Sequence, residues 1–106
     1  MGMVSFACYR PIPGKEEQLS QLMEEHVPIL RGEGLVTDRV PVIVRSKDGT
    51  VIEVFEWNSA EAIAEAHSNQ TVHALWARFN EACTYVKLSE LPESADMFAN
   101  FTPLED

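Results

Sequence analysis

The chain has 106 residues, of which 45% are hydrophobic, so its length and composition predict one folded domain spanning residues 1–106 and argue against a disordered chain. Its 17 acidic and 8 basic residues give a net charge of −9, which disfavours nucleic acid and anionic membrane surfaces as partners. Cys8 and Cys83 form no metal-type pair, no apolar run approaches the ~20 residues of a membrane span, and no export signal is visible. We therefore expect a reduced, cytoplasmic protein without a bound metal or cofactor.

The first two predicted elements are a strand and a long helix. Residues 3–10 are rich in β formers and stop before Pro11, which cannot donate to a strand ladder. The period then changes to steps of three and four, typical of an amphipathic helix. The residues at these steps are Leu19, Leu22, Met23, His26 and Leu30. We expect Pro28 to kink this helix and Gly32 or Gly34 to end it.

A hairpin follows the helix. Residues 36–45 and 50–57 are both rich in β formers, and Ser46-Lys47-Asp48-Gly49 separates them. Asp-Gly between two apolar runs favours a tight turn, because Gly and Asp tolerate positive φ. The two runs are therefore predicted to pair.

The last third of the chain is predicted to hold two helical segments and a strand. Asn58 is expected to cap a short helix that ends near His67, with Glu61 reaching back to the cap. A second helical stripe comprises Val72, Leu75, Trp76, Phe79 and Cys83. We place the final strand at residues 97–104 rather than at residues 85–88, because Val86 continues the helical stripe.

The order of these elements predicts the fold class. A β-α-β-β-α-β sequence indicates an α+β, ferredoxin-like fold, in which helices cover one face of a four-stranded antiparallel sheet. Both faces of the predicted strands are apolar, whereas a wetted face should alternate to polar residues. At about 25 cal/mol per Å2, an exposed face of this kind would forfeit many kcal/mol. We therefore expect a homodimer joined through the sheet faces.

This pattern resembles the dimeric α+β barrel superfamily, and within it the antibiotic-biosynthesis-monooxygenase-like domains. The segments that carry the resemblance are the DGT hairpin followed by VIEVFEW, the NSAEAIAEAH segment and the HALWARF helix. The likeness covers residues 3–104 and is one of pattern, since no invariant catalytic motif is matched. It implies a cavity between each sheet and its own helices. Relatives include quinone-forming monooxygenases that need no cofactor, and haem-degrading enzymes.

Three histidines are candidates for chemistry because imidazole titrates near neutral pH. His26 lies on the apolar stripe of the first helix and is expected to point toward the sheet, as a base or as a core residue held by one hydrogen bond. His67 follows Ile63 by one helical turn and is expected to face inward, as a catalytic group or as a cation at the helix end. His73 is expected at the cavity rim or in solvent.

Carboxylates and aromatic residues complete the candidate site. Glu53 and Glu56 lie on opposite faces of one strand, so at least one points toward the helices or the dimer interface. We include Glu56 among the substrate-binding residues, with an ion pair at the interface as the alternative. Trp57, Trp76 and Tyr9 are expected to line a dry pocket for a flat organic molecule, although such residues also fill cores.

Together with these residues, the resemblance implies cofactor-independent oxygenation of a small aromatic or enolic substrate. His26 would deprotonate the substrate, with His67, Trp76 and Tyr9 as orienting donors. A non-catalytic domain that binds a small molecule is the alternative. Haem degradation fits less well because the first strand lacks the asparagine of that branch, although His73 is a conceivable iron ligand. A metal site built from His26, His67 and a glutamate has no support from spacing.

Overall fold

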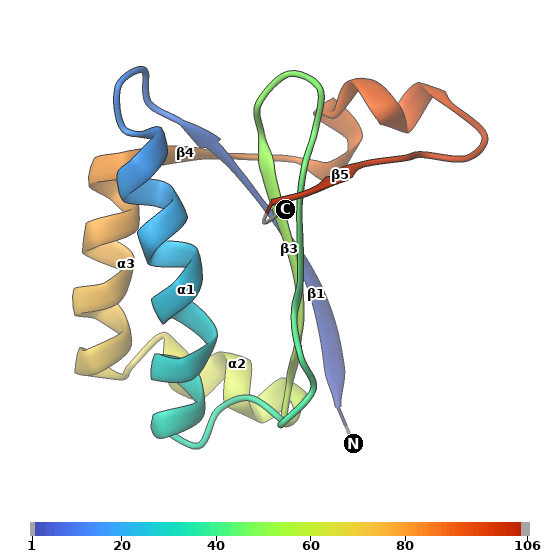
Figure 1. Cartoon of the computed structure of the whole chain (residues 1–106). Coiled ribbons are helices and arrows are strands. Elements are labelled where there is room, and N and C mark those ends of the chain that lie inside the picture. Colours follow the sequence, from blue (N-terminus) through green and yellow to red (C-terminus); the bar gives the residue numbers. More distant parts are fainter. Residues whose placement is uncertain (1, 105–106) are drawn as a thin grey trace.

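An antiparallel sheet of five strands, with helices against one face, forms the framework of the computed structural model, which describes residues 2–104 (Figure 1). The strands are β1 (Met3–Pro11), β2 (Val42–Arg45), β3 (Val51–Trp57), β4 (Cys83–Val86) and β5 (Thr102–Pro103). The α-helices are α1 (Glu16–Gly32), α2 (Ala60–Ala66) and α3 (Gln70–Ala82), and two short 3-10 turns, Leu88–Glu90 and Pro92–Ala95, follow β4. The fold is thus a mixed α+β arrangement.

The strand order is β4-β1-β3-β2-β5, so β1 and β3 lie at the centre of the sheet. These two strands pair antiparallel from Met3 opposite Trp57 to Tyr9 opposite Val51. Because side chains alternate along a strand, this register directs alternate residues of both central strands toward the helices. The helix-facing positions near the middle are Ser5, Ala7 and Tyr9 of β1, and Val51, Glu53, Phe55 and Trp57 of β3.

The hairpin between β2 and β3 and the end of α1 follow the predicted turn chemistry. Gly49 has a φ of 93°, which only glycine adopts without strain, and the Ser46 N–H donates to the Thr50 carbonyl at 2.8 Å. Helix α1 continues past Pro28 and ends at Gly32, and Gly34 follows it with a φ of 74°.

The helix caps differ in one position from the prediction. Ser59, not Asn58, caps α2, because its hydroxyl accepts the Ala62 N–H at 3.1 Å. The Asn58 side chain instead donates to the Gly34 carbonyl at 2.7 Å and joins this turn to the end of α1. Asn69 caps α3 by accepting the Val72 N–H at 3.0 Å.

The predicted final strand at residues 97–104 is wrong for most of its length. Cys83 has an extended backbone (φ −155°, ψ 171°), and β4 then pairs with β1. Strand pairing at the edge of the sheet therefore overrides the helical periodicity of this segment. Only Thr102 and Pro103 of the predicted segment pair, with β2, whereas Met97 is 91% exposed. The predicted strand at residues 36–45 is likewise shorter, since only Val42–Arg45 forms β2.

Two apolar layers flank the sheet. The helix-side layer contains the largest buried side chains, among them Leu19, Leu22 and Leu30 of α1 and Phe79 of α3. On the opposite face, which we call the outer face, Leu91 covers Cys8 and Ile52. The segment that carries Leu91, residues 88–101, projects from this side of the sheet, and we call it the arm (Figure 1). No helix formed by residues 2–104 has both the length and the apolarity that a bilayer crossing requires.

A buried carboxylate attaches the arm to the hairpin. Glu93 is only 4% exposed, and its Oε1 accepts the Ser46 hydroxyl at 2.7 Å. Its Oε2 accepts the Lys47 backbone N–H at 2.9 Å. Burial alone would raise the pKa of Glu93, but the hydrogen bonds from Lys47 and Ser46 outweigh it, so the pKa lies below its usual value.

Glu93→Gln should therefore loosen the arm at neutral pH. A depressed folded-state pKa means that the carboxylate stabilises the fold above its usual pKa, and that this contribution is lost as pH falls through the depressed value. We expect faster hydrogen exchange of the arm amides and a lower melting temperature than in the native protein, with the difference closing in acid. Glu90→Gln, an exposed position in the same arm, is the control. Equal exchange rates in the native protein and Glu93→Gln at neutral pH would contradict this role.

Candidate functional site

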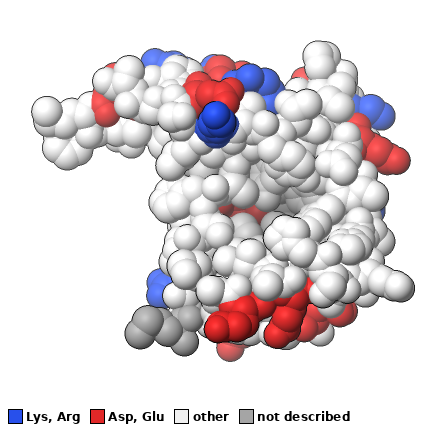
Figure 2. All heavy atoms as spheres, turned by 180° about the vertical axis from the view of Figure 1, so that it is seen from behind, with Lys and Arg blue, Asp and Glu red and all other residues white. Residues whose placement is uncertain are grey.

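A cavity of about 440 Å3 lies between the inner face of the sheet and the helices. Figure 2 shows it as a hollow walled mostly by uncharged residues. Strands β1, β3 and β4 and all three α-helices contribute to its wall. The lining residues are Ser5, Ala7, Tyr9, His26, Phe55, Trp57, Ile63, Trp76, Phe79, Asn80 and Tyr85. Its size and its aromatic wall are typical of a site for a small organic molecule.

A buried glutamate stands behind this wall. Glu53 is 0% exposed, because it occupies a helix-facing position of the central strand β3. Its Oε1 accepts the Tyr9 hydroxyl at 2.9 Å and lies 2.7 Å from Nδ1 of His26. A buried carboxylate is costly unless it is paired, and here one oxygen receives both polar neighbours. The three side chains join β1, β3 and α1 at one point.

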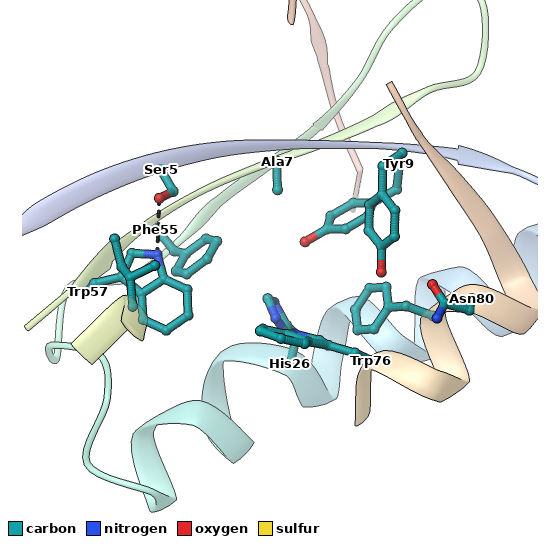
Figure 3. A pocket seen from close by; sticks show the side chains of 11 residues that line it. Ser5, Ala7, Tyr9, His26, Phe55, Trp57, Trp76 and Asn80 are labelled. Carbon is teal, nitrogen blue, oxygen red and sulfur yellow. Dashed lines mark hydrogen bonds between the residues drawn. The ribbon is translucent and has the colours of Figure 1, made fainter. Parts of the chain in front are cut away.

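The ring of His26 is held in a single orientation. Besides its contact with Glu53, it meets Phe55 and Phe79 edge-on, with ring centroids 5.4 Å and 5.0 Å away. Because Glu53 accepts a hydrogen bond at Nδ1, that nitrogen carries the proton in the neutral ring. Among residues 2–104, Nε2 has no hydrogen-bond partner, and His26 lines the cavity. In this tautomer Nε2 is the unprotonated nitrogen, and the ring that carries it lies in the wall of the cavity (Figure 3).

The two tyrosines of the site are neutral donors. Burial first, and then the negative charge of Glu53, raises the pKa of Tyr9 well above its usual value, so its hydroxyl keeps its proton. Partial burial, with a smaller effect of Cys83, raises the pKa of Tyr85 to about 12. Neither group can act as the base at neutral pH, which leaves that role to His26.

The second oxygen of Glu53 is unusual. Glu53 Oε2 is buried and has no hydrogen-bond partner among the described residues. The carboxylate group is thus anchored through one oxygen while its charge remains close to the cavity.

Four of the predicted site residues line the cavity together, namely Tyr9, His26, Trp57 and Trp76. Trp57 is buried, and its indole N–H donates to the Ser5 hydroxyl at 3.0 Å, which fixes the ring against the sheet (Figure 3). Trp76 approaches the cavity from α3 and is half-buried. The catalytic and binding roles of these residues remain predictions.

Three predicted residues lie elsewhere. The expectation that His67 faces inward is wrong: it is exposed at the end of α2, and Nδ1 contacts the Ile63 carbonyl at 2.9 Å. His73 is also exposed and is not among the lining residues, and its ring centroid lies 6.1 Å from that of Trp76. Glu56 lies on the outer face, where it accepts hydrogen bonds from Thr37 and Arg39 at 3.0 Å.

Strand parity could have identified the residue that the sequence-based selection left out. Glu53 lies two positions after Val51 and two positions before Phe55, so its side chain points to the same, helix-facing side of β3. Glu56 follows Phe55 directly, so its side chain points to the opposite side. The lining positions Asn80 and Tyr85 carry no comparable signal. Asn80 is an exposed position of α3, and the direction of the Tyr85 side chain depends on the register in which β4 pairs with β1.

Metal-binding geometry is not apparent in the described part of the chain. Residues 2–104 contain no group of three or more His, Cys, Asp or Glu side chains arranged to hold a metal ion. His26 and Glu53 contact each other directly, while His67 lies on the surface of α2. The histidines and glutamate considered from the sequence as metal ligands therefore do not meet at one point.

Comparison with known proteins supports the fold. No protein-family model and no curated protein matches the chain. The solved structure of Rv0793 from Mycobacterium tuberculosis is similar, with a TM-score of 0.62 and 20% sequence identity. The match covers 79% of this chain and 85% of that chain. At this identity the similarity supports a small α+β fold and carries no information about activity.

Proposed function

We propose that this protein is a cofactor-independent, monooxygenase-like enzyme that deprotonates a small aromatic or enolic substrate with His26. The observation that carries the proposal is the contact between Glu53 and Nδ1 of His26 at 2.7 Å, which leaves Nε2 facing an aromatic cavity. A carboxylate that holds an imidazole in one tautomer, and stabilises the imidazolium that forms, is an established way to prepare a general base.

The proposed reaction needs only the substrate, the base and dioxygen. His26 Nε2 takes a proton from the substrate hydroxyl or from the carbon beside its carbonyl, which gives a resonance-stabilised anion. The anion carbon forms a bond to dioxygen, and the imidazolium returns its proton to the resulting peroxide. Loss of water then breaks the O–O bond and removes the hydrogen that remains on the carbon that bonded to dioxygen, so this carbon becomes a carbonyl, one oxygen atom enters the product and the other leaves in water.

The surroundings of His26 suit this chemistry. Phe55 and Phe79 enclose the ring, and Trp57 and Trp76 supply flat apolar surfaces against which an aromatic substrate can stack. Exclusion of water strengthens the interaction between the imidazolium and the substrate anion, and it protects a reactive intermediate from side reactions. Ser5, Asn80 and Tyr85 are available to bind oxygen atoms of the substrate.

We further infer that two copies assemble through their outer faces, as in a dimeric α+β barrel. The strand order β4-β1-β3-β2 is the order that a ferredoxin-like sheet requires, and β5 extends it at one edge. Away from the arm, the outer face exposes Val4 (50%), Phe6 (58%) and Val42 (56%). Neighbouring exposed apolar side chains on a sheet indicate an interface, and a second copy offers an identical surface.

Substitution of His26 tests the catalytic proposal. His26→Gln keeps a polar side chain of similar reach but removes the base, so oxygen uptake with an anthrone or a naphthol should fall by about 100-fold or more. Oxygen consumption and product absorbance would be measured together. His73→Gln, an exposed histidine outside the cavity lining, should retain native rates. Native rates in His26→Gln would contradict the proposal, and binding without any turnover in the native protein would favour the non-catalytic alternative.

The dimer is tested on the outer face. Phe6→Glu places a charge at a 58% exposed position of β1, where it would be desolvated only if another copy covers it. We expect the native protein to sediment near twice 11.9 kDa, and Phe6→Glu to sediment near 11.9 kDa with its circular dichroism unchanged. Glu81→Gln, on the exposed side of α3, is the control. A native monomer at micromolar concentration would contradict the assembly.

A further inference from the structure

The charge balance of the cavity is one-sided. None of the residues that line it is a lysine or an arginine, and His26 is the only histidine among them. Directly behind the wall, Glu53 is 0% exposed and contacts His26 and Tyr9. A molecule in the cavity therefore meets a buried carboxylate nearby and no opposing cation in its lining.

The field of Glu53 should be only weakly screened at this position. Its Oε2 has no hydrogen-bond partner in residues 2–104, and the aromatic rings of Phe55 and Phe79 pack against His26 beside it. In such surroundings a charge acts at an effective dielectric constant well below that of water. An anionic ligand would lose its hydration and gain no partner charge, so it is penalised twice.

The polar groups of the wall are suited to uncharged ligands. Ser5, Asn80 and Tyr85 offer hydroxyl and amide groups, and the raised pKa of Tyr85, about 12, keeps its hydroxyl neutral. Figure 3 places Ser5 and Asn80 toward opposite ends of the cavity, with His26 between them. Donors at both ends match a flat molecule that carries hydroxyl or carbonyl oxygens at its edges.

We propose that this cavity selects uncharged aromatic ligands bearing hydroxyl or carbonyl groups and rejects carboxylated or phosphorylated ones, and that Glu53 determines this selection. The inference rests on the proposed function only in taking the cavity as the substrate site, since it concerns binding and not turnover. Glu53 thereby has two roles, as the group that orients His26 and as the fixed charge that excludes anions.

The test uses two ligands that differ by one charge, 6-hydroxy-2-naphthamide and 6-hydroxy-2-naphthoate, titrated calorimetrically at pH 7. Unit charges ~8 Å apart at an effective dielectric constant of ~20 predict that the amide binds the native protein ~30-fold more tightly. Glu53→Gln should reduce this preference to below ~5-fold, because the repelling charge is gone. Glu56→Gln removes a carboxylate from the same strand on the outer face and should leave the preference unchanged.

A second variant keeps the proposal testable if Glu53→Gln does not fold. Asn80 lies on an exposed turn of α3 and lines the cavity, so Asn80→Arg adds the missing cation without disturbing the core. It should shift the ratio of the two affinities toward the naphthoate by ~10-fold, because the added charge attracts only the anionic ligand. Equal affinities of the two ligands in the native protein would overturn the proposal, as would a preference that persists in both variants.

The outcomes separate this inference from the catalytic proposal. A preference for the amide with no oxygen uptake from any hydroxylated aromatic would remove the catalytic proposal and leave the charge selection standing. Oxygen uptake that depends on His26, with equal binding of amide and carboxylate, would support the catalytic proposal and overturn the charge selection.

Discussion

The contact of Glu53 with His26 and Tyr9 is the interaction on which the rest of the structure depends. It joins the two central strands to α1 inside the apolar layer, where a carboxylate without partners would be strongly destabilising. Removing one member of a buried pair typically costs about 3–5 kcal/mol, whereas an apolar replacement of all members is often neutral. A fold that needed only stability could therefore dispense with these groups, and their position beside the cavity supports the proposed catalytic role.

The two proposals assign different tasks to the two faces of the sheet. The inner face combines Glu53 with the aromatic side chains Phe55 and Trp57, and the helices cover it without filling the space in front of His26. The outer face is covered in part by the arm through Leu91, which leaves Val4 and Phe6 exposed. Chemistry on one face and assembly on the other are compatible because alternating side chains let one strand serve both.

Periodicity in the sequence predicted the inner elements well and the edges poorly. The helical stripe through His26 and the Asp-Gly hairpin depend on local patterns, and both are found in the structure. Strand β4 depends on pairing with β1, a contact between residues far apart in the sequence. The sequence does not reveal this contact, because Val86 also fits the helical periodicity. The candidate site divides in the same way: His26 follows from its stripe, whereas His67 lies where a short helix ends, so a small error in phase turns it to the surface.

The tautomer of His26 tests the central claim most directly. A long-range proton–nitrogen correlation spectrum of uniformly labelled protein, with His26 assigned by comparison with His26→Gln, distinguishes the two ring nitrogens. The account predicts that the neutral form of the ring carries its proton on Nδ1, toward Glu53, and leaves Nε2 unprotonated. A proton on Nε2 with Nδ1 bare would contradict it, because that tautomer leaves no base in the cavity.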